Sequence, residues 1–145
     1  MKTFGMKDAR HAEIAERHGE PVATRLYLSF VQAYAQHVAR LDPDLFSHPE
    51  PCLPALQAAL HDYEKEMEEP FPQDPARQLA EVLRSMARAW EGTSARLLRQ
   101  SRGAPAEAGL GLVVQAMAGG FGTGESGAGT IQFVDPVTGA EQGTG

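Results

Sequence analysis

The chain has 145 residues, the length of a single domain, which is enough to bury a modest core but too short for a multidomain enzyme. Its formal net charge is -6 and only 7% of its residues are aromatic, so it offers neither the basic stripe nor the stacking platform that nucleic-acid binding requires. A single cysteine, Cys52, excludes an internal disulfide, and no apolar run approaches the ~20 residues of a membrane span. These features predict a soluble cytoplasmic protein with no nucleic-acid or membrane partner.

The first 20 residues predict a weakly ordered helical segment. Charged residues occupy almost every second position, and Ile14 and several alanines are all that such a helix could bury. His11 and His18 lie two turns apart, but metal-binding histidines commonly lie one turn apart, and no carboxylate cluster completes a site. We interpret both as solvated side chains and expect no metal site.

From Pro21 the apolar spacing predicts an amphipathic helix. Its apolar residues recur at steps of three and four, as on a helix that faces a core: Leu26, Phe30, Ala33, Tyr34, His37, Val38 and Leu41. His37 is therefore interpreted as a core histidine rather than a catalyst. Asp42-Pro43 ends the helix, because the residue before a proline is pushed out of the helical region.

Two further helices are predicted between Leu53 and Trp90. The first ends near Glu68 in a crowd of glutamates, which we interpret as a solvated acidic end, with a cation site or a contact as the alternative. The second begins at Asp74-Pro75, an N-cap acceptor followed by a proline at the first helical position. Its apolar face is continuous: Leu79, Val82, Leu83, Met86, Ala87 and Trp90.

A short fourth helix is predicted after Gly92, with Thr93 or Ser94 as its cap. Two leucines and three arginines lie on it or at its end: Leu97, Leu98, Arg96, Arg99 and Arg102. The arginines could hold phosphates or carboxylates, although a basic helix surface is the simpler interpretation.

Residues 109–145 predict an antiparallel β-hairpin around a glycine-rich loop. Apolar and polar or small residues alternate in 110–115 and again in 129–134, as in two short strands. Six glycines fall within residues 119–129, and a proline-containing turn follows at 135–139. The loop is not a P-loop, because the lysines of the chain all lie far upstream, and its glycine spacing does not fit a dinucleotide fingerprint.

Several short motifs in the second half of the chain stand in a recognisable order. They are Gln115-x-Met117, Ser126-Gly127-x-Gly129 and Asp135-Pro136-x-Thr138-Gly139, preceded by Trp90, Ala95, Arg99 and Pro105. The pattern runs without a gap from Trp90 to Gly139 and resembles the nucleotide-binding domain of pyruvate phosphate dikinase. That family phosphorylates a histidine from ATP and passes the phosphate to pyruvate. Less dense similarity extends back through residues 71–79 to about Ile14.

The resemblance implies a mainly α (α+β) fold of about four helices with a C-terminal hairpin, as part of one lobe of an ATP-grasp domain. The expected organisation is a weakly ordered segment over 1–20, a helical subdomain over 21–108 and the hairpin over 109–145. In the family the segment after the first strand passes the adenine, and ATP and magnesium are the cofactors. The nucleotide-binding residues implied here are Gln115, Met117, Gly119, Gly127 and Arg99.

The same resemblance implies that the chain is not catalytic alone. The family's phosphate-binding lysine, its metal-binding carboxylates and its phospho-accepting histidine domain have no counterpart in this sequence, so we expect no catalytic or metal residue and weak ATP binding at most. Val134 and Ser94 also stand where the family has arginines. The preferred hypothesis is a segment of a dikinase-like domain, whose partners are the missing lobes. The alternatives are a degenerate protein-binding module and a different helical enzyme with chance similarity.

Overall fold

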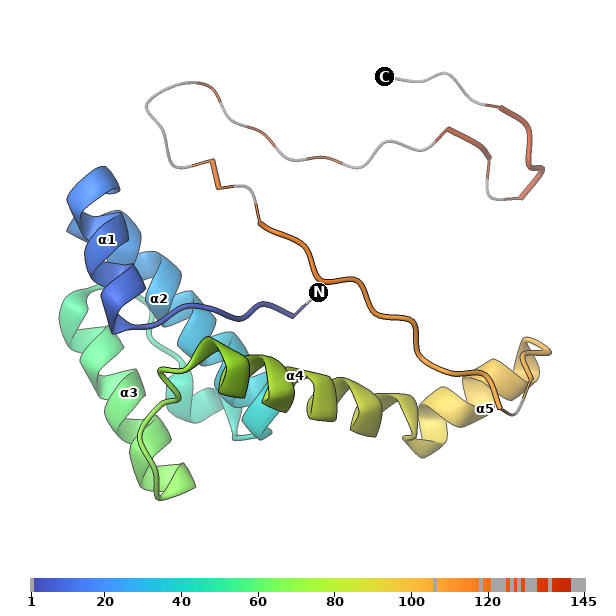
Figure 1. Cartoon of the computed structure of the whole chain (residues 1–145), viewed down its shortest axis with the longest axis horizontal. Coiled ribbons are helices and arrows are strands. Elements are labelled where there is room, and N and C mark those ends of the chain that lie inside the picture. Colours follow the sequence, from blue (N-terminus) through green and yellow to red (C-terminus); the bar gives the residue numbers. More distant parts are fainter. Residues whose placement is uncertain are drawn as a thin grey trace. The chain divides into compact units, whose positions relative to one another are not determined.

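The computed structural model describes residues 2–105, 107–117, 119–120, 125, 127, 129, 133–135 and 137–141. The chain divides into two units, Met1–Gln115 and Ala116–Gly145, and each is described by itself. The first unit contains α1 (Asp8–His18), α2 (Glu20–Tyr34), α3 (Leu53–Met67), α4 (Pro75–Trp90) and α5 (Thr93–Ser101) (Figure 1). A π-helical turn, η1 (Ala35–Ala39), continues α2, and a 3-10 helix, η2 (Pro43–Phe46), precedes α3. The prediction of a mainly helical chain is therefore confirmed.

Local sequence signals set the beginning of α4. The Asp74 carboxylate accepts hydrogen bonds from Ala76 N at 3.0 Å and Arg77 N at 3.3 Å, and Pro75 occupies the first helical position, where its missing N–H costs nothing. Asp42 caps η2 in the same way by accepting from Asp44 N. The beginning of α4 was predicted, because it depends on neighbours in the sequence alone. Asp42-Pro43 was predicted only as the end of the preceding helix, and the structure adds the 3-10 helix that begins there.

The core is an aromatic cluster centred on Phe71, which lies in the connection between α3 and α4. The rings of Tyr63 and Tyr34 meet the Phe71 ring edge-to-face, with centroids 5.0 and 5.3 Å away. Tyr27 and Phe30 approach the same ring at 6.2 and 5.8 Å. All five side chains are buried, and such edge-to-face pairs add stability beyond the area that they bury. The cluster fixes α2 and α3 against this connection.

Helix α1 packs against α2 through polar and aromatic contacts, since it has no buried residue of its own. The Tyr27 hydroxyl donates to Asp8 Oδ1 at 2.9 Å, and the His11 ring lies 5.8 Å from the Tyr27 ring and 3.2 Å from Thr24 Oγ1. His11, predicted to be solvated, is therefore in a helix contact. The prediction that His37 is a core residue is wrong, because its side chain is exposed.

The residues before α1 form an N-terminal strap, residues 2–7, that lies against α4. Gln78 is completely buried; its Oε1 accepts from Gly5 N at 2.6 Å, and its Nε2 donates to Met6 O at 2.8 Å and Pro72 O at 2.6 Å. Asp8 N donates to Gln73 Oε1 at 2.8 Å. Gln78 therefore binds the strap backbone at Gly5 and Met6, where no strand pairs with it among the residues described, and Gln73 binds the first residue of α1.

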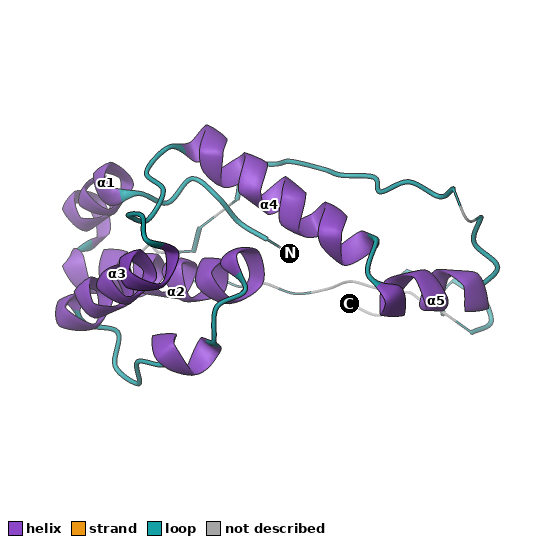
Figure 2. Cartoon of the chain, turned by 90° about the horizontal axis from the view of Figure 1, so that it is seen from below, coloured by secondary structure: helices purple, strands orange, loops and turns teal. Residues whose placement is uncertain are grey.

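The predicted C-terminal hairpin is not seen in the described part of the chain, which Figure 2 draws as helix and loop. Residues 110–115 are exposed and have no strand structure, and half of the second predicted strand, residues 130–132, lies outside the described residues. An isolated bridge joins Val134 to Glu141. A lone two-stranded hairpin is marginal in water, and the glycines of this region raise the entropic cost of pairing, so alternation alone did not produce a sheet.

The turn predicted at 135–139 is present in the second unit. Asp135 Oδ1 accepts from Val137 N and Thr138 N, both at 2.8 Å, and these bonds hold the pKa of the Asp135 carboxyl below its ordinary value. Gly139 N donates to Asp135 O at 2.8 Å, and Gly139 has φ 70°, a conformation that glycine adopts without strain. The turn forms because its hydrogen bonds are local.

Candidate functional site

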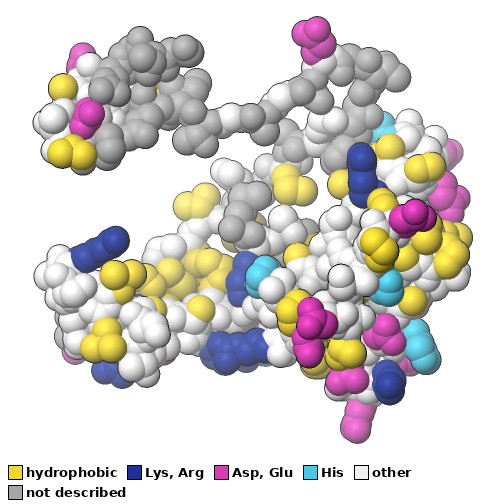
Figure 3. Space-filling view, turned by 180° about the vertical axis from the view of Figure 1, so that it is seen from behind, with side chains coloured by type: hydrophobic (Ala, Val, Ile, Leu, Met, Phe, Trp, Pro, Cys, Tyr) yellow, Lys and Arg dark blue, Asp and Glu magenta, His cyan; other side chains and the backbone are white. Residues whose placement is uncertain are grey.

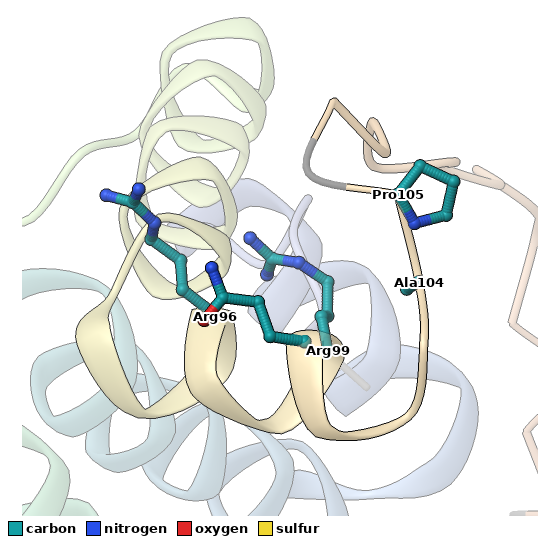
Figure 4. A pocket seen from close by; sticks show the side chains of 5 residues that line it. Arg96, Arg99, Ala104 and Pro105 are labelled. Carbon is teal, nitrogen blue, oxygen red and sulfur yellow. The ribbon is translucent and has the colours of Figure 1, made fainter.

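A shallow hollow lies between α5 and the residues that follow it. Its lining residues are Arg96, Arg99, Gln100, Ala104 and Pro105 (Figure 4). Its cavity volume is ≈ 30 Å³, whereas pockets that enclose drug-sized ligands measure roughly 300–1,000 Å³. The hollow can therefore receive one small anionic group, such as a carboxylate or a phosphate, but it cannot enclose a nucleotide.

Arg99 is held in place by Trp90 at the end of α4. The guanidinium carbon lies 3.9 Å from the centroid of the Trp90 ring, and Arg99 Nη1 donates to Trp90 O at 2.6 Å. The indole Nε1 donates in turn to Ala108 O at 3.1 Å. One of the five N–H groups of Arg99 is used in its bond to Trp90 O, and the others are available to an anion at the hollow.

Arg96 and Gln100 complete the polar side of the hollow. Figure 4 shows Arg96 and Arg99 projecting to the same side of α5, as the spacing of three residues requires. The sequence from 84 to 102 contains five arginines and one acidic residue, Glu91, although the whole chain is acidic. On the face that Figure 3 shows, the acidic side chains of the first unit gather mainly toward the end of that unit opposite α5. The hollow thus lies in the basic part of an acidic protein.

Of the five predicted nucleotide-binding residues, Arg99 lines this hollow. Gln115 is exposed near the end of the first unit, and Met117 is 66% exposed in the second. Gly119 and Gly127 are exposed there too, and a Cβ added at Gly127 would meet no atom within 4 Å. Arg99 and Gln115 thus belong to the first unit, and the other three residues belong to the second. Sequence reasoning also missed Trp90 as the residue that orients Arg99, because the contact crosses the break at Gly92.

A second polar cluster lies where α2, α3 and α4 meet. Arg77 forms ion pairs with Glu69 and with Glu81, the latter at 2.8 Å, and Glu81 Oε2 accepts from the Tyr34 hydroxyl at 2.7 Å. Arg77 holds the pKa of the Glu69 carboxyl below its ordinary value. Glu69, from the acidic end of the helix predicted from Leu53, is thus in a contact, the alternative interpretation of that end. We assign this cluster a structural role, because each of its charged groups has a partner of opposite charge within it.

The described residues include no group of three or more His, Cys, Asp or Glu side chains that could hold a metal ion. In the same part of the chain, none of the helices is both long and apolar enough to cross a membrane. No family model matches the chain, and neither a curated protein nor a solved structure matches it.

Proposed function

We propose that this chain is a segment of a pyruvate phosphate dikinase-like nucleotide-binding domain, which binds ATP weakly and transfers no phosphate alone. The order of motifs from Trp90 to Gly139 supports the family. The observation that carries nucleotide binding is the hollow that Arg96 and Arg99 both line, with Arg99 held by Trp90. The β-hairpin belongs to this proposal, because the missing lobe would supply the neighbouring strands that it needs.

The affinity should be low for a geometric reason. A guanidinium pair can bind one phosphoryl group through charge-assisted hydrogen bonds, but a cavity of ≈ 30 Å³ leaves the ribose and the base in water. Each tenfold loss of affinity corresponds to about 1.4 kcal/mol, and few apolar contacts are available to compensate. We therefore expect a dissociation constant in the millimolar range.

A titration with ATP and magnesium, followed by amide chemical shifts, tests the proposal. We expect shifts around Arg96, Arg99 and Gln115 that are lost in the double variant R96Q/R99Q. The control R25Q removes a positive charge from an exposed position on α2 and should bind ATP as the unchanged chain does. Shifts that persist in R96Q/R99Q, or that fall on α3 alone, would show that the site is elsewhere.

A protein-binding module is the second candidate function. Its support is the exposure of Leu97 (60%) and Leu98 (53%) on α5, a helix with no buried residue. Under this proposal the module is a degenerate relative of the dikinase domain whose partner is another protein, and binding of that protein should broaden the α5 resonances. The variant L97S/L98S should abolish this effect, whereas R96Q/R99Q should abolish only the response to ATP.

A further inference from the structure

Two cationic side chains from distant parts of the sequence, Lys2 and Arg88, donate to neighbouring carbonyls in η1, which continues α2. Lys2 Nζ donates to His37 O at 2.7 Å and to Ser85 Oγ at 2.5 Å, and Arg88 Nη2 donates to Val38 O at 3.4 Å. Arg40, close enough to repel Lys2 electrostatically, follows directly in the chain. The strap, the end of α2 and helix α4 each supply one of the three charges.

The backbone at this point departs from regular helix. The turn Ala35–Ala39 is π-helical, and Arg40 has φ 63°, a left-handed conformation that a residue with a Cβ adopts at an energetic cost. At the end of the π-helical turn the carbonyls of His37 and Val38 accept hydrogen bonds from side chains, and Lys2 and Arg88 supply these bonds. Strained backbone of this kind often marks a functional position.

The positive charge exceeds what the end of the helix can neutralise. A helix C-terminus carries roughly half a negative charge, whereas Lys2, Arg40 and Arg88 carry three positive ones. None of the ion pairs described involves any of the three. Burial lowers the pKa of Lys2, and repulsion from Arg40 and Arg88 lowers it further. An anion bound among them would remove this repulsion.

Lys2 does not activate Ser85 as a catalytic nucleophile, although the two side chains are hydrogen-bonded. Ser85 is 2% exposed, so a substrate cannot reach it. Its hydroxyl donates to His37 O at 2.7 Å while Lys2 donates to Ser85 Oγ, so the hydroxyl proton is directed at a carbonyl rather than at a base. Binding is therefore the chemistry that this cluster can support.

We propose that Lys2, Arg40 and Arg88 form a binding site for a phosphate group. Each side chain keeps N–H groups beyond those used on the carbonyls, and guanidinium groups bind tetrahedral oxyanions through paired charge-assisted hydrogen bonds. The ligand is inorganic phosphate or a small phosphomonoester. Because Lys2 belongs to the strap, binding also holds the strap against α4.

The first test compares phosphate with chloride at equal ionic strength. Inorganic phosphate should shift the amides of residues 2–7 and 37–41 and raise the unfolding temperature. In R40N the affinity should fall about tenfold, since one charge-assisted contact is lost. The unfolding temperature of R40N without phosphate should not fall, because asparagine tolerates the left-handed conformation and one repulsive charge is gone. The matched control R25Q should respond to phosphate as the unchanged chain does.

The second test measures amide hydrogen exchange in and next to the strap. Phosphate should slow the exchange of the Gly5 and Asp8 amide hydrogens, which donate to Gln78 and Gln73. Parallel titration with glycerol phosphate distinguishes the sources: a response to both ligands indicates a phosphomonoester site, and a response to inorganic phosphate alone indicates a free-phosphate site. An equal phosphate response in R40N and R25Q, or no slowing of exchange, would overturn the proposal. The variant R96Q/R99Q should leave both responses intact, so failure of the ATP site is a separate result.

Discussion

Two buried tyrosines, Tyr34 and Tyr63, differ in whether the side-chain hydroxyl has a hydrogen-bond partner. Tyr34 donates to Glu81 at 2.7 Å, whereas the Tyr63 hydroxyl is buried and has no hydrogen-bond partner among the described residues. A buried polar group without a partner costs roughly 1–3 kcal/mol, and a hydrogen bond to a charged group contributes about 1.5–3 kcal/mol. The two phenylalanine substitutions should therefore change stability in opposite directions.

We expect Tyr63→Phe to raise the free energy of unfolding by about 1 kcal/mol and Tyr34→Phe to lower it by about 2 kcal/mol. Urea denaturation followed by circular dichroism measures both, and each variant is the control of the other because both keep the ring. A destabilised Tyr63→Phe would indicate that a buried water satisfies the hydroxyl.

The ionisation of the tyrosines should be coupled to unfolding. The chain has three tyrosines, and all three lie in the aromatic core: Tyr27, Tyr34 and Tyr63. Burial raises the pKa of each, to about 12 for Tyr63, with nearby carboxylates adding to the effect. A raised pKa in the folded state contributes stability that is complete below the unfolded value of 10.0 and is lost as the pH rises above it.

We therefore expect little tyrosinate absorbance in the folded chain just above pH 10. The absorbance should then appear together with the loss of helical circular dichroism, and in urea it should appear near pH 10. A spectrophotometric titration with and without urea measures this. Ionisation of any tyrosine near pH 10 in the folded chain would contradict the buried positions of all three.

At the scale of elements, a single side chain joins the strap to α4. The Gln78 side-chain amide accepts from Gly5 N and donates to Met6 O and Pro72 O. The variant Gln78→Met keeps most of the volume but leaves one N–H and two carbonyls without partners, so it should lower the free energy of unfolding by about 2 kcal/mol or more. The matched control is Gln36→Met at an exposed position, which should change little.

Hydrogen exchange separates this explanation from a general packing defect. In Gln78→Met the Gly5 amide should exchange faster, while amides within α3 should follow only the global loss of stability. If the Gly5 amide exchanges at the same rate in both variants, the glutamine does not hold the strap.

At the scale of the whole molecule, the positions of the buried residues predict that the first unit folds without the second. The fully buried residues of the described chain lie between Ala23 and Ser85, so a chain ending at Gln115 retains them all. We expect its free energy of unfolding to match that of the full chain within about 0.5 kcal/mol. A chain that begins at Asp8 is the control, because it lacks the strap and should be less stable. Unfolding followed by Trp90 fluorescence measures all three chains.

The chain alone should not transfer phosphate from ATP. Phosphoryl transfer depends on positioning and on neutralising charge, and the chain lacks counterparts of the lysine, metal carboxylates and histidine domain of the family that it resembles. With ATP, phosphate, pyruvate and magnesium, we expect no phosphoenolpyruvate above background. An intact pyruvate phosphate dikinase serves as the positive control, and product formed by this chain alone would contradict the proposed function.

The sequence by itself determined the features that depend on near neighbours. Apolar residues at steps of three and four predicted the main helices, Asp74-Pro75 predicted the beginning of α4, and the Asp135 turn followed from its own local hydrogen bonds. The sequence also singled out Arg99, as one of three arginines that could hold phosphates or carboxylates and as a nucleotide-binding residue implied by the resemblance.

Only the tertiary structure decided the features that depend on distant partners. The alternation in 110–115 predicted a strand, but strands need neighbours for their backbone groups, and the described chain provides none there. Gln78 and Ser85 are polar, yet both are buried, because the strap supplies hydrogen-bond partners for Gln78 that lie 72 and 73 residues away and the π-helical turn supplies one for Ser85 that lies 48 residues away. For the same reason the meeting of Lys2, Arg40 and Arg88 is invisible in the sequence: charges far apart in the chain become one site only when α2, α4 and the strap pack together.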